Sequence, residues 1–401
     1  MSSLRRLLGI ALFVAFVSGC WPTPGAGPDR RSFNPFERTL TPATVGRLTE
    51  AFRADLPDGA GPPVVTVDGL FVRTGLSIAA FEPGTGAPRW SVRLPEFDDR
   101  DFFFTVSEPH VVDGRHQVLA TSSYRFAGLH VTLVALASRT GAAERRPVSG
   151  VLTSFRGTDL AVVRRDVADT SDITSLFVIG PDGEQRWGGW AGWARDGAGS
   201  LGQGQFFLTT GTSVQAYDTT TPCPVPPGGW LRQCDPQWIH RVGATPSPVV
   251  IGDEATVYVG GGTAVVALDA GSGAVRWSSD VGAVVTTAPA LADGVLYAGA
   301  DDGRLVALAA GGCGATSCVP MWTTPAAGAT SVQPAVAGDV VYVGSTDGTL
   351  RAFDADGCEA ATCQPLWTTD VGAPVTGGLA VYGGQLYVGT QTGLVAYGLP
   401  A

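Results

Sequence analysis

The feature that most constrains the fold is one pattern that occurs three times between residues 246 and 372. Each copy contains a Tyr-X-Gly segment, then a second short apolar run, and it closes with Trp277, Trp322 or Trp367. A repeat of about 40–45 residues with several short strands in each copy predicts the blades of a β-propeller. A single sheet of this kind leaves both faces exposed, and stacking around an axis buries them against neighbours.

Positions equivalent to the closing tryptophans recur along the chain and indicate the number of blades. They are Phe52, Trp90, the region of Arg145 and Arg146, Trp187, Trp238, Trp277, Trp322 and Trp367. We therefore expect an all-β fold, an eight-bladed β-propeller over residues 47–399. Seven blades is the alternative if the second and third blades, whose pattern is weakest, are divided wrongly.

The two ends of the propeller are expected to meet in one blade. The last three apolar runs, 378–381, 386–389 and 394–397, end without a closing tryptophan. Residues 52–56 align with 367–371, which form an expected outer strand. An N-terminal strand that joins the last C-terminal blade would complete it and remove an exposed sheet edge.

The N-terminus has the pattern of a lipoprotein export signal. Arg5 and Arg6 precede an apolar run that is too short for a stable membrane anchor, and residues 17–20 have the sequence Val-Ser-Gly-Cys. We expect a signal peptide over 1–19, lipidation of Cys20, and a flexible tether and lead-in over 20–46, because residues 21–32 are rich in Pro and Gly. The protein would then be exported and anchored to the extracytoplasmic face of a bacterial membrane.

The other six cysteines form three local pairs at equivalent points of their repeats. The pairs are Cys223 with Cys234, Cys313 with Cys318, and Cys358 with Cys363. An even number of cysteines in an exported chain favours disulfides. We expect each pair to close the loop between the third and fourth strands of its blade and to be a structural link.

Several segments resemble the pyrroloquinoline quinone (PQQ)-like β-propeller family. They are the motif 267–277 (ALDAGSGAVRW), the entries 247–249 and 288–290, and the opening that contains Asn34, Glu37 and Leu40. The resemblance covers roughly residues 33–399, and it implies an eight-bladed propeller whose tryptophans dock between adjacent blades. In this chain the docking residues would be Trp90, Trp187, Trp238, Trp277, Trp322 and Trp367.

The family that this chain resembles has catalytic and non-catalytic members, and the residues of this chain favour the non-catalytic group. Quinoprotein dehydrogenases of the family have a vicinal disulfide beside the quinone and a calcium ion held by acidic and amide side chains. This chain has no Cys-Cys dipeptide and no lysine, and its only asparagine, Asn34, precedes the propeller. We therefore expect no cofactor, no catalytic residue and no metal site, with PQQ plus Ca²⁺ as the alternative.

Net charge and local motifs exclude other classes of function. A formal net charge of −10 gives no basic surface for phosphate backbones, so we expect no nucleic-acid partner. His110, His116 and His130 lack the spacing of common metal motifs and are interpreted as scattered polar positions. No G-x-S-x-G element suggests a hydrolase. We expect a monomer.

Two connections between blades stand out as candidate recognition loops. One is acidic and contains Phe97, Asp98 and Asp99, and the other is Gly-rich and contains Trp190 and Trp193. Both are expected on the face opposite the cysteine loops, and variable loops on a rigid scaffold commonly carry function. The alternative is that the two tryptophans only cover a blade edge.

The sequence therefore predicts a non-catalytic binding or scaffolding propeller at the outer face of the cell envelope. Its partners would be the membrane, through the lipid anchor, and an envelope protein or glycan. The alternatives are a quinoprotein-type oxidoreductase that uses PQQ, or an envelope-assembly or glycan-binding lipoprotein.

Overall fold

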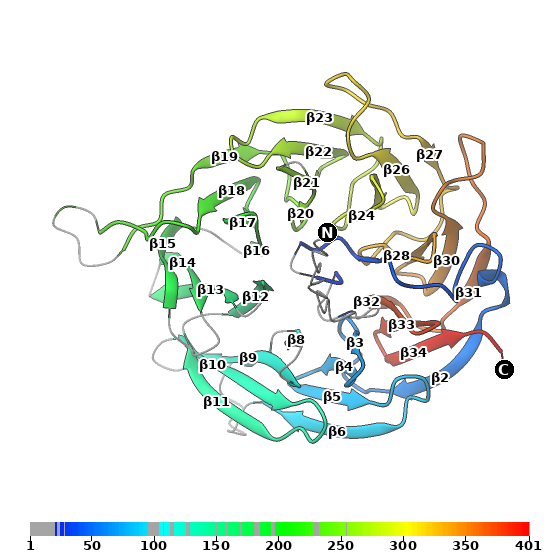
Figure 1. Cartoon of the computed structure of the whole chain (residues 1–401), viewed down its shortest axis with the longest axis horizontal. Coiled ribbons are helices and arrows are strands. Elements are labelled where there is room, and N and C mark those ends of the chain that lie inside the picture. Colours follow the sequence, from blue (N-terminus) through cyan, green and yellow to red (C-terminus); the bar gives the residue numbers. More distant parts are fainter. Residues whose placement is uncertain are drawn as a thin grey trace, which may run out of the picture.

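The structure is a computed structural model of the chain. It describes residues 21, 25–27, 29–94, 104–106, 108–112, 116–125, 129–148, 151–156, 159–168, 171–179, 185–193, 197–225, 227, 232–253 and 255–400. The strands in these ranges form eight sheets. The sheets follow one another around a ring, which is the arrangement of a β-propeller, and the expected all-β propeller is confirmed (Figure 1).

Blades one to four are built from consecutive strands. Blade one contains β3 (Val64–Thr66), β4 (Gly69–Thr74), β5 (Ser77–Phe81) and β6 (Pro88–Arg93). Blade two contains β7 (Phe104–Val106), β8 (His110–Val112), β9 (Gln117–Arg125), β10 (Leu129–Ala137) and β11 (Ala143–Val148). Blade three contains β12 (Val151–Arg156), β13 (Asp159–Ala168), β14 (Ser171–Ile179) and β15 (Gln185–Trp193). Blade four contains β16 (Gly197–Gly202), β17 (Gln205–Thr210), β18 (Ser213–Asp218) and β19 (Trp238–Arg241).

Blades five to eight follow in the same order. Blade five contains β20 (Val250–Ile251), β21 (Thr256–Gly261), β22 (Ala264–Asp269) and β23 (Val275–Asp280). Blade six contains β24 (Ala290–Ala292), β25 (Val295–Gly299), β26 (Leu305–Ala309) and β27 (Trp322–Thr323). Blade seven contains β28 (Ala335–Ala337), β29 (Val340–Gly344), β30 (Thr349–Asp354) and β31 (Trp367–Asp370). Blade eight contains β32 (Val375–Tyr382), β33 (Gln385–Thr390) and β34 (Gly393–Gly398).

Each blade places its first strand near the axis and its last strand at the perimeter (Figure 1). Because neighbouring strands are antiparallel, the two ends of the strands form the two faces of the ring. One face carries the turns between first and second strands, such as 293–294, and the loops between third and fourth strands, such as 310–321. We call it the disulfide face. The connection face carries the turns between second and third strands, such as 300–304, and the blade-to-blade connections, such as 281–289.

The hydrophobic core lies between blades, as the repeat predicts. One buried cluster joins Tyr297 and Leu305 of blade six to Val336 and Phe353 of blade seven. The middle strands are therefore apolar on both faces, and Leu305 to Leu308 in β26 are all buried. Burial on both faces explains why these runs do not alternate between apolar and polar residues.

The tryptophans at the outer strands dock against the following blade. Indole Nε1 donates to a backbone carbonyl of that blade at five of the six positions: Trp90 to Ser138 (3.0 Å), Trp187 to Thr221 (2.9 Å), Trp238 to Ala270 (2.7 Å), Trp277 to Ala310 (3.0 Å) and Trp367 to Leu48 (3.2 Å). Glycines leave space for the rings: a Cβ on Gly273 would lie 2.6 Å from the Trp238 ring. The structure thus has the docking that the family resemblance implies.

The N-terminal region completes two blades. Strand β2 (Thr49–Asp55) pairs antiparallel with β34, with Phe52 opposite Ala396, so the predicted closure of the last blade is confirmed. A short 3-10 helix, η1 (Val45–Arg47), precedes it. Strand β1 (Phe33–Asn34) pairs in parallel with β28 and extends blade seven toward the axis, which was not expected.

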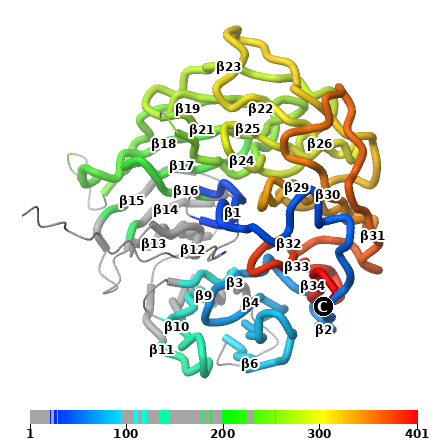
Figure 2. The backbone as a smooth tube through the Cα atoms, turned by 45° about the vertical axis from the view of Figure 1, so that its right-hand side comes forward, coloured from blue at the N-terminus to red at the C-terminus, as the bar shows by residue number. Residues whose placement is uncertain are grey.

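The described part of residues 21–32, predicted to be a flexible tether, makes ordered backbone contacts with the ring. Trp21 is fully buried and exchanges two backbone hydrogen bonds with Val65 of blade one, with N···O distances of 2.7 and 2.9 Å. On the other side of the axis, Ile251 donates to Asp29 O and Leu291 donates to Arg31 O. The segment fills hydrogen-bonding positions that the innermost strands would otherwise leave open, and it lies inside the ring (Figures 1 and 2).

The three expected disulfides are present in the structure. Cys223 bonds to Cys234, Cys313 to Cys318 and Cys358 to Cys363. All three close loops between third and fourth strands, as the sequence spacing predicts. Each therefore fastens a loop on the disulfide face. Cys20 lies outside the described residues.

The two predicted recognition loops have different outcomes. Phe97, Asp98 and Asp99 lie outside the described residues. Trp190 and Trp193 are not in a connector, because both belong to β15 and pair with Ser175 and Ile173 of β14. The Gly-rich stretch continues the outer strand, but its pairing with β14 has register shifts. These irregularities explain why the sequence pattern resembled a loop. Whether either region recognises a partner stays a prediction.

Candidate functional site

The N-terminal segment forms a hairpin inside the ring. The chain through Trp21 runs antiparallel to β3, whereas β1 runs parallel to β28. Between them, Ser32 N donates to Gly25 O (2.8 Å) and Arg30 N donates to Gly27 O (3.1 Å). Since the first strands all run toward the disulfide face, this axial hairpin, residues 21–34, enters from that face and returns to it.

A cluster of charged and polar side chains, partly buried, lies where blades one and two meet. The Arg73 guanidinium donates to the Glu108 carboxylate, with 2.7 Å between Nε and Oε1. Burial raises the pKa of Glu108, and the positive charge of Arg73 opposes this effect. Burial lowers the pKa of Arg30, on the hairpin, to about 10. The ion pair compensates the cost of placing a carboxylate at the axis.

His110 belongs to this cluster and is neutral at physiological pH. Its Nδ1 lies 3.0 Å from Glu108 O, and its side chain is buried. Burial, with a smaller contribution from the charge of Arg30, lowers the pKa of His110 to about 4, although the hydrogen bond to the Glu108 carbonyl opposes this effect. A neutral imidazole with Nδ1 protonated donates to the carbonyl, so this bond holds the segment that leads into β8. The only signal of this arrangement in the sequence is the proximity of Glu108 and His110 in the chain.

Arg31 connects the same hairpin to the other side of the ring. Its Nε donates to Ile251 O (3.0 Å), and its Nη2 lies 2.7 Å from Asp253 Oδ1. This hydrogen bond lowers the pKa of Asp253. Gln333 of blade seven donates to Arg30 O (2.8 Å). The described part of the hairpin therefore contacts blades one, five, six and seven from inside the ring.

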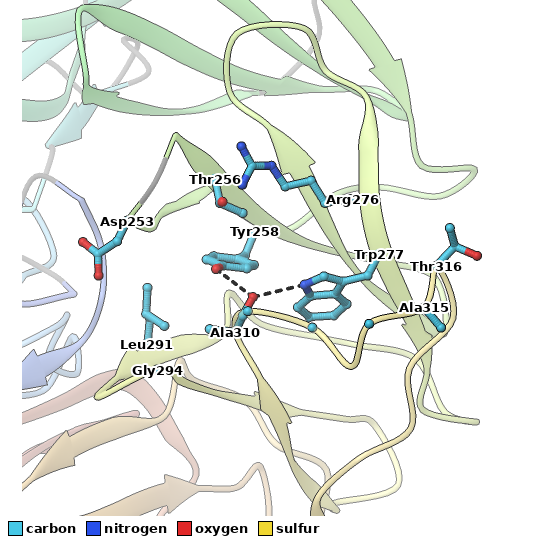
Figure 3. A pocket seen from close by; sticks show the side chains of 13 residues that line it. Asp253, Thr256, Tyr258, Arg276, Trp277, Leu291, Gly294, Ala310, Ala315 and Thr316 are labelled. Atoms are coloured by element: carbon cyan, nitrogen blue, oxygen red, sulfur yellow. Dashed lines mark hydrogen bonds between the residues drawn. The ribbon is translucent and has the colours of Figure 1, made fainter.

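A pocket of about 540 Å³ opens between blades five and six on the disulfide face. The buried rings of Tyr258 and Trp277 form its base, and both donate to Ala310 O at 3.0 Å (Figure 3). Asp253 and Arg276 lie at opposite sides of the pocket (Figure 3). The remaining wall is the glycine-rich disulfide loop: Gly311, Gly312, Gly314, Ala315 and Thr316.

The charged side chains that line this pocket are engaged by neighbouring groups. Arg276 Nη2 lies 2.8 Å from Asp269 Oδ2, and this hydrogen bond, with one from Ser272, lowers the pKa of Asp269 to about 2. Asp253 is engaged by Arg31. The pocket is therefore lined by one carboxylate and one guanidinium, each already paired with an opposite charge. No activated nucleophile lies among its lining residues. A small polar ligand could fit it.

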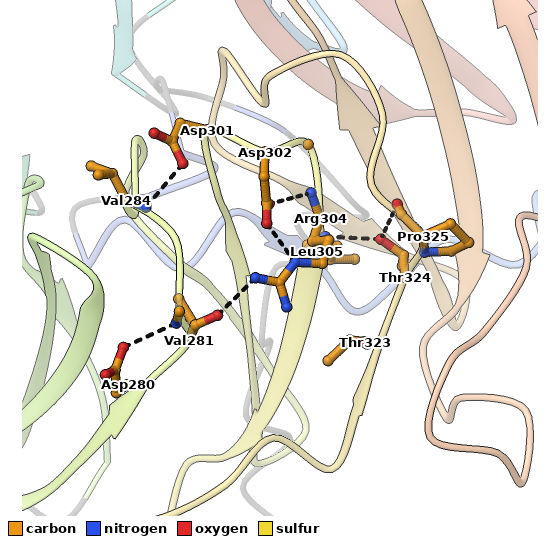
Figure 4. Close-up of polar contacts among 12 residues, drawn as sticks. Asp280, Val281, Val284, Asp301, Asp302, Arg304, Leu305, Thr323, Thr324 and Pro325 are labelled. Carbon is orange, nitrogen blue, oxygen red and sulfur yellow. Dashed lines mark hydrogen bonds and ion pairs between the residues drawn. The ribbon is translucent and has the colours of Figure 1, made fainter.

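The connection face is held by polar contacts between blades. Arg304 pairs with Asp302, with 2.6 Å between Nε and Oδ2, and its Nη2 donates to Val281 O at 3.0 Å (Figure 4). Asp301 accepts a hydrogen bond from Val284 N (2.9 Å). The turn of blade six therefore binds the connection that leads into it. These contacts make the connection face of blades five and six a rigid surface.

Arg351 joins blades six and seven at this face. Its Nη2 donates to Gly303 O (2.7 Å), and its guanidinium lies 5.7 Å from the centre of the Phe353 ring. Burial lowers its pKa. Through these contacts Arg351 links blades six and seven at the connection face, which is a structural role.

Among the described residues, no group of three or more His, Cys, Asp or Glu side chains could hold a metal ion. No helix there is long and apolar enough to cross a bilayer. His110 donates toward a backbone carbonyl, and His116 Nδ1 lies 2.7 Å from Asp68 Oδ2. These two histidines have separate partners.

One protein-family model matches part of this chain. The model is described as outer membrane protein assembly factor BamB and matches residues 181–359. The similarity is to PQQ-like β-propeller proteins. No curated protein matches the sequence.

Solved structures of PQQ-like propellers share the fold. Quinohemoprotein alcohol dehydrogenase from Comamonas testosteroni has a TM-score of 0.69 and 14% identity, over 95% of this chain and 80% of that one. BamB from Moraxella catarrhalis has a TM-score of 0.59 and 17% identity, over 87% of this chain and 97% of that one. At these identities the similarity establishes the architecture, and the function has to come from the site.

Proposed function

We propose that this chain is a non-catalytic, lipid-anchored, monomeric propeller that binds another protein at the outer face of the cell envelope. The observation that carries the proposal is the axial hairpin, because the chain places its own residues inside the ring and bonds them to the innermost strands. The BamB profile over 181–359 supports an envelope role. The export pattern that ends at Cys20 supports the anchor.

The residues at the axis do not fit the quinone and calcium pair of the catalytic members. Asn34, the only asparagine, donates its amide to Val381 O (2.9 Å), so this amide is committed to the backbone of blade eight. Glu108 is committed to Arg73, and the sequence has no Cys-Cys dipeptide. These observations favour binding over oxidoreduction.

Photo-crosslinking in intact cells tests the partner. A photoreactive residue at Asp98 or Asp99, in the predicted acidic recognition loop, is expected to capture one envelope protein. The same residue at Glu359, an exposed position on the disulfide face, is the control. Capture at Glu359 but at neither aspartate would contradict the choice of face, and no capture at any position would contradict a protein partner.

A titration with PQQ and Ca²⁺ tests the catalytic alternative. This alternative is tested because a quinohemoprotein alcohol dehydrogenase has the same fold. We expect no binding and no dye reduction with simple alcohols or sugars. Tight binding with turnover would replace the proposed role by quinoprotein oxidoreduction. A glycan partner is tested in parallel by tryptophan fluorescence against wall polysaccharides.

A further inference from the structure

We infer that the disulfide face lies against the lipid bilayer and that the connection face points away from it. This inference rests on the lipid anchor of the proposed function and adds an orientation to it. Two independent observations support it: the direction in which the axial hairpin enters the ring, and the distribution of exposed apolar side chains over the two faces.

The first observation concerns where the chain enters. Trp21 is fully buried and pairs with Val65 next to the turn that joins β3 to β4 on the disulfide face. Because the pairing is antiparallel, the backbone N–H side of Trp21 lies toward that face. Adjacent Cα atoms are about 3.8 Å apart. A lipid on Cys20 would therefore begin one residue from a buried anchor, and it would hold this face close to the bilayer without a spacer.

The hairpin is too firmly held to act as a spacer. Backbone hydrogen bonds fix it at Val65 on one side and at Ile251, Leu291 and Val336 on the other. The ion pair between Arg31 and Asp253 adds a contact at the disulfide face, at 2.7 Å. A flexible linker would let the propeller rotate freely above the membrane, whereas this attachment restricts its orientation.

The second observation is an excess of exposed apolar side chains on the disulfide face. In blades five to eight, where the structure describes both faces, Val275, Val319, Met321 and Leu366 are exposed on or next to that face. Val284 is the exposed large hydrophobic residue on the connection face of the same blades. Apolar side chains that are costly to expose in water become favourable where they meet the acyl boundary of a bilayer.

Two more exposed residues surround the point of entry. Val67, in the turn after β3, is 67% exposed, and Phe36, just after β1, is 54% exposed. They flank the two ends of the axial hairpin at the disulfide face. Apolar contact around the anchor would add to the membrane affinity that the lipid provides.

The experiment measures the distance of each face from lipid. The full-length chain is produced in a lipidating host, and the mass of its N-terminal peptide shows whether Cys20 is modified. Val67→Cys, on the disulfide face, and Val284→Cys, on the connection face, are labelled with a fluorophore. Both proteins are placed on phosphatidylcholine vesicles that contain a lipid-borne quencher.

We expect strong quenching of the label at position 67 and little at position 284. A third protein carries a long Gly-Ser insertion between Cys20 and Trp21, and its label at position 67 should lose most of the quenching while vesicle binding persists. Equal quenching at both positions, or stronger quenching at 284, would overturn the orientation, and an unmodified Cys20 would remove its basis. Crosslinking to an envelope protein is a separate readout, so the proposed function can fail or hold independently.

Discussion

The contacts between blades and the contacts at the axis stabilise the ring by different physical means. Between blades, Trp277 and Tyr258 pack against a glycine-rich loop and donate to one carbonyl. Closer to the axis, Arg73 of blade one pairs with Glu108, and the buried imidazole of His110 bonds to the Glu108 carbonyl. The first kind of contact depends on shape and is insensitive to pH. The second depends on protonation, and this difference can be tested directly.

The largest effect is expected from removal of an inter-blade tryptophan. Trp277→Ala deletes a buried ring that is 3% exposed and should lower the free energy of unfolding by about 3–5 kcal/mol. Trp322→Ala, at the next interface, should cost a similar amount. Urea unfolding at pH 7 and pH 5 measures both, and the loss should be the same at the two pH values. A loss confined to one pH would contradict an apolar contact.

His110 should make the axis pH-sensitive. Its pKa is about 4 in the folded chain and about 6.5 when unfolded, so the unfolded state binds the proton more tightly. The stability that the neutral imidazole provides is complete above about pH 6.5 and is lost as pH falls toward 4. At 1.36 kcal/mol per pKa unit, the total loss is roughly 3 kcal/mol.

His110→Asn is the matched variant, because its amide can still donate to the carbonyl of Glu108. The difference in unfolding free energy between wild type and variant should shrink between pH 7 and pH 4.5. Glu108 titrates in both proteins and cancels in this difference. A difference that does not change with pH would show that His110 is not neutral and buried in the folded chain.

The same contrast explains what the sequence could predict. Blade interfaces were predictable because Trp277, Trp322 and Trp367 recur with glycines and short strands at regular spacing. The closure through Phe52 was also predictable, since that stretch matches the outer strands of the repeats. These features are local patterns repeated along the chain, and repetition separates them from chance.

The axial hairpin was not predictable by the same means. Its contacts are long-range, as between Arg31 and Asp253, and no second copy of them exists in the repeat. Pro and Gly favour a tether by composition, whereas in the structure Gly25, with φ of +78°, forms part of a tight turn. The charged cluster likewise unites residues whose sequence neighbourhoods give no common signal. Composition alone therefore gives no sign of the ordered contacts that the described part of residues 21–32 makes.

Two glycines of one disulfide loop test whether the Trp277 interface depends on close packing. A Cβ on Gly312 would lie 2.6 Å from the Trp277 ring, whereas a Cβ on Gly314 would meet nothing within 4 Å. Both glycines have positive φ, +81° and +80°, so the backbone strain of an alanine is shared. Gly312→Ala should cost roughly 1–3 kcal/mol more than Gly314→Ala in urea unfolding. Equal costs would mean that the ring can move away.

The smallest loss of stability is expected from removing a tyrosine hydroxyl, and it should differ between the interface of blades five and six and that of blades six and seven. Ala310 O accepts from both Tyr258 and Trp277, whereas Ala355 O accepts from the Tyr297 hydroxyl (2.9 Å). Trp322 Nε1 has no hydrogen-bond partner among the described residues. Tyr258→Phe leaves the Trp277 donor in place and should cost about 0.5–1 kcal/mol, because one of two bonds is lost.

Tyr297→Phe removes the hydroxyl donor of Ala355 O and should cost about 1–3 kcal/mol, unless the Trp322 indole turns to replace it. The double variant Tyr297→Phe, Trp322→Phe distinguishes these cases in urea unfolding. Additive costs would mean that the indole never reaches the carbonyl, whereas an excess cost in the double variant would show that it substitutes for the lost hydroxyl. The tryptophan would then act at this interface by volume in the wild type and by hydrogen bonding only when the tyrosine is absent.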